Sequence, residues 1–310
     1  MNTRDLRFRS NRVSDILALF HQDLDPMYGP GEVSAMVEIL FDAFLQWDRV
    51  KLLMSKNATI DQSDLLRFHW ALEDLKQWRP VQHIVAKVDF CGCTIEVGPD
   101  VLVPRPETEE MVTRLISGEW WPTKAVQMPS TACGSRVAPW SCLDLCTGSG
   151  CIAIALKKAF PMVETTAVDI SERALAVARR NAVANGTEVS FVRADILSPQ
   201  FSLTAESFHL IVSNPPYVRK SERQYMSRNV TDYDPEEALF VPDDDALRFY
   251  VVLARLSRCG LVDGGVVVVE INEALADDTR ALFEKQGLAT EVHDDFRGKP
   301  RVIVATKIKQ

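Results

Sequence analysis

The sequence predicts an α/β protein in which a mostly parallel, seven-stranded sheet is preceded by a small helical domain and a β-hairpin linker. Three observations support this prediction. Apolar residues recur at helical spacing up to residue 79, β-branched and alternating residues follow from 82 to 104, and short apolar runs then alternate with helical patterns. The 310 residues give enough length for two modest domains, each with its own core.

The first 79 residues are predicted to form the helical domain. From Val33 to Leu45, apolar residues follow the i, i+3, i+4, i+7 rule and make one apolar stripe. A second helical run begins after Asp61 or Ser63, either of which can cap a helix N-terminus. Pro80 is expected to end that run, because proline cannot continue a helix.

The segment 80–104 is predicted to be a β-hairpin linker, with turns at Gly92 and at Gly98–Pro99. Cys91 and Cys93 flank the first turn. No matching His or Cys spacing accompanies them, so we interpret them as small buried residues of the hairpin and not as metal ligands.

Residues 105–310 are predicted to form the sheet domain. Its first helix begins in the letters PRPETE at 104–109, since Pro106 and the acids after it suit a first helical turn. Residues 118–141 show no period and are interpreted as a surface excursion. A final hairpin, Ala289–Asp294 with Arg301–Lys307, closes the sheet. The other predicted strands are Cys142–Leu145, Thr165–Val168, Val189–Arg193, Phe208–Val212 and Gly264–Ile271.

Composition excludes several classes of protein. The net charge of −8 disfavours non-specific adhesion to nucleic acid or to an anionic membrane. No apolar run reaches the roughly 18–20 residues that span a bilayer, and the N-terminus has no signal-peptide core. The seven cysteines form no paired CxxC motif. We therefore expect a cytoplasmic protein with reduced thiols, no metal, no membrane partner and no direct nucleic-acid partner.

The first strand leads into a glycine-rich loop that runs from Asp144 to Gly150 and enters a helix at Cys151. Gly148 and Gly150 permit positive φ and close ligand approach, while the helix N-terminus offers free N–H groups. The loop has neither the GxGxxG spacing of dinucleotide sites nor the GK[ST] ending of a phosphate-binding loop. A glycine-rich loop alone is therefore a weak signal for one particular ligand.

Polar residues follow three further predicted strands. Asp169 ends the second strand, Asp195 follows the third and Asn214 follows the fourth. Open α/β sheets bind ligands at these carboxyl ends. The acid after the second strand can accept hydrogen bonds from both hydroxyls of a ribose, and the acid after the third can reach an adenine amino group. Helix capping is the alternative for each acid singly, but it does not account for the whole series.

The segment Ser213-Asn-Pro-Pro-Tyr217 is the most informative motif. Each proline holds the residue before it extended, and neither has an N–H to donate. The segment therefore presents two acceptors, the Asn214 side-chain oxygen and the Pro215 carbonyl, beside the ring of Tyr217. Two acceptors next to a flat ring suit a planar NH2 group. A rigid turn after a buried strand is the alternative interpretation.

These motifs resemble those of the class I S-adenosylmethionine-dependent methyltransferases, and among them the protein glutamine methyltransferases. The loop DLCTGSGC, the two strand-end acids and NPPY are similar to that family across residues 142–310. The letters VPRPETE at 103–109 and VTDYDPEEAL at 230–239 resemble the release factor glutamine methyltransferase branch in particular. The resemblance implies a Rossmann-like fold and methyl transfer from S-adenosylmethionine to the glutamine of the Gly-Gly-Gln loop of peptide chain release factors.

The resemblance also implies roles for individual residues. Asn214 and the Pro215 carbonyl would bind the two amide hydrogens, and Tyr217 would stack on the amide plane. Tyr233 and Pro235 would order the segment after NPPY over the site, and the helical domain would dock the protein substrate. The residues implied for the cofactor are Asp144, Thr147, Gly148, Gly150, Asp169, Ile170, Asp195, Ile196 and Asn214. Those implied for the substrate are Arg105, Glu107, Thr108, Asn214, Pro215, Pro216 and Tyr217, and for the first three a helix-start role is an equal alternative.

Two positions depart from the release-factor pattern. Cys146 stands where that branch often has glycine, and DLCTGSG is typical of the branch that modifies a large-subunit ribosomal protein. Asn272 also replaces a frequent glycine. The open alternatives are that ribosomal substrate, a DNA adenine methyltransferase, which the evenly spread acidity disfavours, and a non-catalytic adaptor that binds S-adenosylmethionine.

Overall fold

The computed structural model describes residues 8–120 and 140–309 of the chain. The chain divides into two compact units. A helical unit comprises Met1–Ala86 and Ser227–Tyr233, and a sheet unit comprises Lys87–Met226 and Asp234–Gln310. Most of the surface excursion expected at 118–141 lies outside the described residues.

The helical unit is built around an aromatic core. The ring of Phe68 packs against Phe20, Phe41 and Phe44, with ring centroids 4.4–6.3 Å apart. Asp61 occupies the N-cap position of α4, as expected, although its side chain makes no capping hydrogen bond. The helices are α1 (Val13–Tyr28), α2 (Pro30–Leu45), α3 (Arg49–Met54), α4 (Gln62–Lys76), α5 (Val81–Val85) and α9 (Arg228–Thr231).

The helical unit includes two segments that the sequence pattern predicts for other parts of the chain. Residues 81–85, assigned to the linker for their β-branched side chains, form α5, because Val81 and His83 are buried in this unit. Burial against the helices outweighs strand propensity there. Residues 227–233 also belong to this unit, and the Tyr233 hydroxyl donates to the carbonyl of Gln77 at 2.8 Å. No local pattern in the sequence predicts that residues 227–233 belong to the helical unit.

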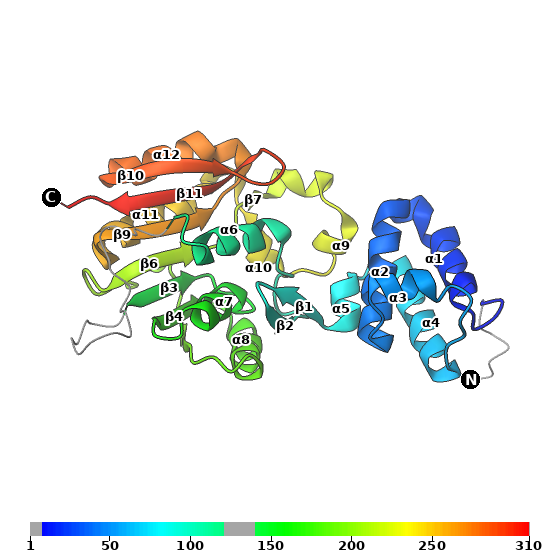
Figure 1. Ribbon diagram of the computed structural model, residues 1–310. Helices are drawn as coiled ribbons and strands as arrows, with labels where there is room; N and C mark the ends of the chain where they lie inside the picture. Colours follow the sequence, from blue (N-terminus) through cyan, green and yellow to red (C-terminus); the bar gives the residue numbers. More distant parts are fainter. Residues whose placement is uncertain (1–7, 121–139, 310) are drawn as a thin grey trace. The chain divides into compact units, whose positions relative to one another are not determined.

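The sheet unit holds the seven-stranded sheet that the sequence predicts, in the order β10-β11-β9-β6-β3-β4-β5 (Figure 1). Strand β11 runs antiparallel to both neighbours, and the remaining pairs are parallel. The strands are β3 (Ser141–Leu145), β4 (Glu164–Asp169), β5 (Ser190–Arg193), β6 (Phe208–Ser213), β9 (Leu261–Glu270), β10 (Leu288–Asp294) and β11 (Pro300–Lys307).

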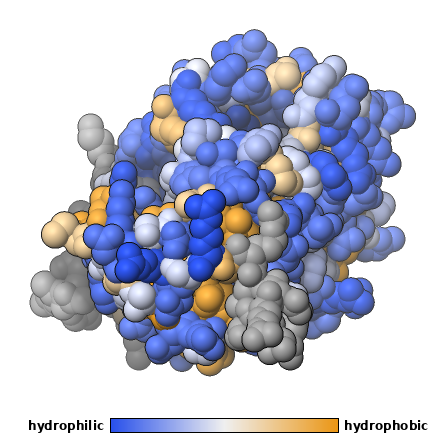
Figure 2. Space-filling view, turned by 90° about the vertical axis from the view of Figure 1, so that its right-hand side faces the viewer, coloured by the Kyte–Doolittle hydropathy of each residue, from blue (hydrophilic) through white to orange (hydrophobic). Residues whose placement is uncertain are grey.

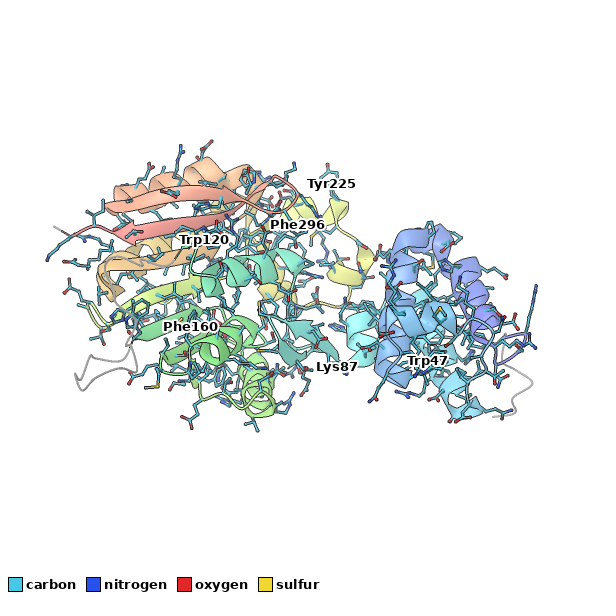
Figure 3. The ribbon with its side chains drawn as sticks, viewed as in Figure 1. Trp47, Lys87, Trp120, Phe160, Tyr225 and Phe296 are labelled. Carbon is cyan, nitrogen blue, oxygen red and sulfur yellow. The ribbon has the colours of Figure 1, made fainter. Side chains whose placement is uncertain are left out.

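Helices cover both faces of this sheet. Because successive side chains of a strand point to opposite faces, the core is divided into two clusters, one on each face. In β6, Leu210 and Val212 join the cluster beneath α6, α7 and α8, whereas Ile211 joins the cluster beneath α11 and α12. Side chains fill the space between the sheet and its helices (Figure 3). These helices are α6 (Pro106–Ile116), α7 (Cys151–Ala159), α8 (Glu172–Ala184), α11 (Arg248–Gly260) and α12 (Ala276–Lys285).

Smaller elements complete the sheet unit. The expected hairpin pairs β1 (Lys87–Phe90) with β2 (Cys93–Glu96). Cys93 is buried in it as expected, whereas Cys91 lies in the turn and is only partly buried. A two-residue strand after the NPPY motif, β7 (Val218–Arg219), pairs in parallel with β8 (Phe240–Val241). The short helices are η2 (Lys220–Tyr225), α10 (Glu236–Leu239), η3 (Asp243–Asp245) and η4 (Glu273–Leu275).

The face shown in Figure 2 is mostly hydrophilic and is broken by a few apolar patches. The large apolar side chains exposed on the helical unit include Val50, Leu53, Met54 and Trp70. In the part of the chain that the structure describes, no helix combines the length and apolar character that a bilayer span requires.

Candidate functional site

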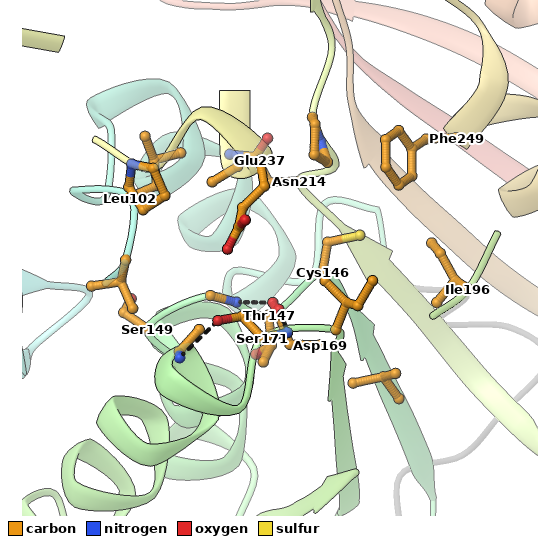
Figure 4. Close-up of a pocket in the computed structure, with 18 of the residues that line it drawn as sticks. Leu102, Cys146, Thr147, Ser149, Asp169, Ser171, Ile196, Asn214, Glu237 and Phe249 are labelled. Carbon is orange, nitrogen blue, oxygen red and sulfur yellow. Dashed lines mark hydrogen bonds between the residues drawn. The ribbon is translucent and has the colours of Figure 1, made fainter. Parts of the chain in front are cut away.

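A cavity of about 400 Å³ lies at the carboxyl ends of the central strands of the sheet unit (Figure 4). Each of these strand ends supplies a lining residue: Cys146 after β3, Asp169 at the end of β4, Asp195 after β5 and Asn214 after β6. Residues 100–102, 104 and 105 and the segment around α10 also line the cavity. The structure thus brings the predicted series of strand-end residues together around one space.

The glycine-rich loop after β3 forms the floor of the cavity. Gly148 has φ +55°, and its N–H donates to Asp169 Oδ2 at 2.8 Å. Cys146 has φ +63°, which explains why glycine suits this position and why a cysteine there is a departure. Thr147, Gly148 and Cys146 line the cavity, whereas Gly150, with φ +80°, packs beneath it against Ala178.

Asp144 lies beneath the same loop and does not line the cavity. Its Oδ2 accepts hydrogen bonds from the Thr147 hydroxyl at 2.5 Å and from the Ala153 N–H at 3.3 Å. Its Oδ1 is buried and accepts no hydrogen bond within the described ranges. Burial raises the pKa of Asp144 to about 7, because a carboxylate loses its hydration there. The carboxyl group therefore shapes the loop from below.

Backbone N–H groups hold both carboxylate oxygens of Asp169. Oδ1 accepts from the Ser171 N–H at 2.9 Å and Oδ2 from Gly148. Burial raises the pKa of Asp169, and the backbone N–H groups oppose that shift. Next to it, the exposed Ile170 lines the cavity. This acid therefore sits at the cavity wall in an orientation that the loop sets.

The third strand end contributes an acid and an apolar residue to the wall. Asp195 accepts from the Leu197 N–H at 2.9 Å, and the buried Ile196 also lines the cavity. Figure 4 shows Ile196 on the same side as Phe249, opposite Leu102. The cavity thus has an apolar region beside a carboxylate, which suits a heteroaromatic ring with an amino group.

The NPPY motif lies at the edge of the cavity, where Asn214 and Pro216 line it. The Asn214 Nδ2 group donates to the Thr108 hydroxyl at 3.0 Å. Pro215 and Tyr217 do not line the cavity, and the Tyr217 hydroxyl donates to Glu270 Oε1 at 2.9 Å. The motif is therefore held by polar contacts at both ends.

Of the three substrate residues expected at 105–108, two line the cavity. Arg105 does so while pairing with Asp234 at 2.5 Å, and Thr108 does so from the first turn of α6. Glu107 does not line it and lies 3.7 Å from Arg297. The helix-start position of these residues is also observed, since Pro106 is the first residue of α6.

Several site residues carried no sequence signal. Leu102 and Phe249 line the cavity as ordinary apolar residues, and only the tertiary fold brings them there. Glu237 comes from α10, near Asn214 in Figure 4. Glu270, which touches Thr108 and Tyr217, had one available signal: it is the single charge in the apolar run at 264–271. A lone charge in a buried strand marks a group that needs specific partners.

Comparisons with known proteins agree with this geometry. Residues 136–231 match the family model described as the methyltransferase small domain, and residues 28–85 match the PrmC N-terminal domain. The release factor glutamine methyltransferase of Flavobacterium psychrophilum is 37% identical over 92% of this chain and 95% of that protein. The protein of the same name from Bacteroides thetaiotaomicron is 36% identical over 95% of this chain and 100% of its own length.

A similar protein of known structure also matches this chain. The release factor-specific protein-(glutamine-N5) methyltransferase from Alicyclobacillus acidocaldarius is 29% identical to this chain. The match covers 69% of this chain and 99% of that one, with a TM-score of 0.38.

Proposed function

Because the chain belongs to the release factor glutamine methyltransferases, we propose that it transfers a methyl group from S-adenosylmethionine to the glutamine of the Gly-Gly-Gln motif in peptide chain release factors. The acceptor atom is the side-chain amide nitrogen. The observation that carries the proposal is that Asn214 and Pro216 of the NPPY motif line the same cavity as Gly148, Asp169 and Asp195.

The cavity fits the cofactor by its chemistry. Gly148 leaves room beside the loop, since a Cβ at this position would meet no atom within 4 Å. We assign the methionine part to Thr147 and Gly148, the ribose to Asp169 and Ile170, and the adenine to Asp195 and Ile196, which all line the cavity. When bound, S-adenosylmethionine supplies an electrophilic methyl group on a sulfonium, and S-adenosylhomocysteine is the product. Asp144 and Gly150 support the loop from behind.

The protein side chains align the acceptor. An amide nitrogen is a weak nucleophile because its lone pair is delocalised into the carbonyl. Asn214 Oδ1 and the Pro215 carbonyl would accept its two hydrogens, aim the nitrogen and stabilise the positive charge that develops on it. Positioning of this kind can supply up to about 7–11 kcal/mol of the barrier. Tyr217 is assigned to the substrate side as a flat surface, and Arg105 and Thr108 border its entry.

The partner proposed for the helical unit is the release factor itself. Residues 28–85 match a domain that is described with this family, and the same unit holds residues 227–233 after the NPPY motif. A translation factor as substrate places the enzyme in the cytoplasm. We propose no direct contact with nucleic acid, because the acidity is spread along the chain.

The test offers radiolabelled S-adenosylmethionine and the purified enzyme to a release factor. The matched control is the same factor with its motif glutamine replaced by alanine. We expect label on the intact factor only, and loss of that label with the Asn214→Ala enzyme. Label on a large-subunit ribosomal protein or on DNA instead would replace the proposed substrate, and cofactor binding without any transfer would favour an adaptor.

A further inference from the structure

A buried glutamate links the two polar ends of the NPPY motif. Glu270, at the end of β9, is 1% exposed, and its two oxygens accept from two different hydroxyls. Thr108 donates to Oε2 at 2.6 Å, and Tyr217 donates to Oε1 at 2.9 Å. Thr108 in turn accepts from Asn214 Nδ2 at 3.0 Å. One carboxyl group therefore reaches Asn214 through Thr108 and reaches Tyr217 directly.

The direction of these hydrogen bonds fixes the orientation of the Asn214 amide. An ionised carboxylate only accepts, so the single hydroxyl hydrogen of Thr108 is used on Glu270. The Thr108 oxygen can then only accept from Asn214, and only the NH2 end of that amide can donate. The oxygen and nitrogen ends of an amide have nearly the same shape, so the network and not steric fit chooses between them. The Asn214 oxygen is left to the cavity side.

We propose that Glu270 and Thr108 are positioning residues that hold Asn214 Oδ1 as the acceptor for the substrate amide. The inference rests on the proposed function, since an amide substrate is what needs an acceptor at this point. With the amide reversed, an NH2 group would face the NH2 group of the substrate, and the two would repel. Tyr217, fixed by the other oxygen of Glu270, keeps its place at the opposite end of the motif.

The groups that touch Glu270 oppose the effect of its burial. Burial raises the pKa of Glu270, the hydroxyls of Thr108 and Tyr217 and the charge of Arg301 lower it, and the charge of Glu107 raises it. Arg301 is itself held by Asp295 at 3.2 Å and by the Ile271 carbonyl at 3.3 Å. A protonated Glu270 would be able to donate to Thr108, whose own hydrogen would then turn toward Asn214. The arrangement therefore requires that Glu270 be ionised.

The first test compares Thr108→Val with Thr108→Ser. Valine keeps the shape but removes the acceptor, whereas serine keeps the hydroxyl. We expect Thr108→Val to lower kcat about tenfold to a hundredfold, with little change in KM or in the dissociation constant of S-adenosylmethionine. Thr108→Ser is expected to retain most of the activity. Equal activity of the valine variant and the wild type, or equal loss in both variants, would overturn the proposal.

Thr279→Val is the matched control for the loss of a buried hydroxyl. Thr279 is fully buried in α12, and its hydroxyl donates to the carbonyl of Leu275 at 2.7 Å. We expect this variant to lose stability and to keep its kcat. If Thr279→Val lost as much kcat as Thr108→Val, the effect would be one of folding and the positioning role would be wrong.

A second readout needs no substrate and separates this inference from the proposed function. In protein labelled with ¹⁵N at asparagine, the Asn214 side-chain NH2 signal is identified by its absence in Asn214→Asp. We expect slow hydrogen exchange of this NH2 in wild type and in Thr108→Ser, and fast exchange in Thr108→Val. Fast exchange in wild type would overturn the network, whereas protected exchange without methyl transfer to release factors would overturn only the proposed function.

Discussion

Single residues of the loop after β3 differ in what surrounds them, although Cys146, Gly148 and Gly150 all have left-handed backbone angles. A Cβ at Gly148 would meet open space. A Cβ at Gly150 would lie 3.0 Å from Ala178 Cβ and 3.1 Å from Ile154 Cδ1. Gly150 therefore serves the packing of α7 against α8, and Gly148 serves the cavity.

We expect Gly148→Ala and Gly150→Ala to separate these two roles. Both substitutions incur about 1–2 kcal/mol for a left-handed backbone, and Gly150→Ala adds about 1–3 kcal/mol of overpacking. Urea unfolding should rank Gly150→Ala as the less stable variant. Calorimetric titration should show the greater loss of S-adenosylmethionine affinity for Gly148→Ala relative to its stability loss. Equal losses in both measurements would contradict the assignment.

Asp144 makes stability depend on pH. Its folded pKa of about 7 lies above the ordinary value of 3.8, so the folded chain binds a proton that the unfolded chain releases between these values. The contribution of Asp144 to the free energy of unfolding is most favourable below pH 3.8, and it is lost as the pH rises to 7. Asp144→Asn does not titrate there. The unfolding free energy of the asparagine variant minus that of wild type should therefore rise by up to roughly 4 kcal/mol between pH 4 and 7.

Urea unfolding at several pH values measures this difference. Above pH 7 the difference should level off, because Asp144 is then ionised in both states. Parallel pH curves for the two proteins would mean that Asp144 does not titrate in this range.

Among the elements, α8 holds the hairpin that leads into the cavity wall. Asn181 accepts from the Glu96 N–H at 2.7 Å and donates to the Glu96 carbonyl at 3.1 Å. Asn185 makes the same pair of contacts with Thr94. The side chains of the two asparagines thus pair with the free backbone edge of β2, as a neighbouring strand would. From β2 the chain continues to the residues between 100 and 105 that line the cavity. The helix thereby sets the position of one wall.

Asn181→Ala is expected to lower the free energy of unfolding by about 1–3 kcal/mol, because it removes both partners of the Glu96 backbone. It should also weaken S-adenosylmethionine binding, since the wall at 100–105 loses its support. Asn185→Ala, at the more exposed end of the same edge, is the control and should have the smaller effect on both. Denaturant unfolding and calorimetric titration measure these quantities, and a larger effect at Asn185 would contradict the argument.

For the whole molecule, the division into two units predicts unequal responses to the cofactor. Every residue that lines the cavity belongs to the sheet unit. A ligand stabilises only the part that binds it, by about 2.7 kcal/mol at a concentration of 100 times its dissociation constant. Scanning calorimetry with S-adenosylhomocysteine should therefore shift the unfolding of the sheet unit and leave that of the helical unit in place.

Asp169→Ala is the control, and in this variant S-adenosylhomocysteine should shift the unfolding temperature of the sheet unit less. Intrinsic tryptophan fluorescence reports on both transitions, because Trp47, Trp70 and Trp78 belong to the helical unit and Trp120 and Trp140 to the sheet unit. An equal shift of both transitions would mean that the two units unfold as one.

The sequence by itself determined the elements of the sheet and the series of strand-end residues around the cavity. Asp169, Asp195 and Asn214 were placed correctly because apolar period and turn chemistry are local, and because parallel strands end at one edge. The prediction from local pattern was wrong at residues 81–85, which form a helix because their side chains are buried against the helical unit. The roles assigned to individual site residues remain predictions.

Only the tertiary structure decided how the motifs contact one another. Thr108 and Glu270 are 162 positions apart, and no periodicity relates them. The transfer of 227–233 to the helical unit and the packing of Gly150 on Ala178 are likewise contacts between distant segments. Local patterns specify a residue's own backbone, whereas the partner of a buried polar group depends on which strands and helices pack together. The sequence shows the NPPY motif and a lone charge at Glu270, and only the fold shows that this glutamate contacts Thr108 and Tyr217.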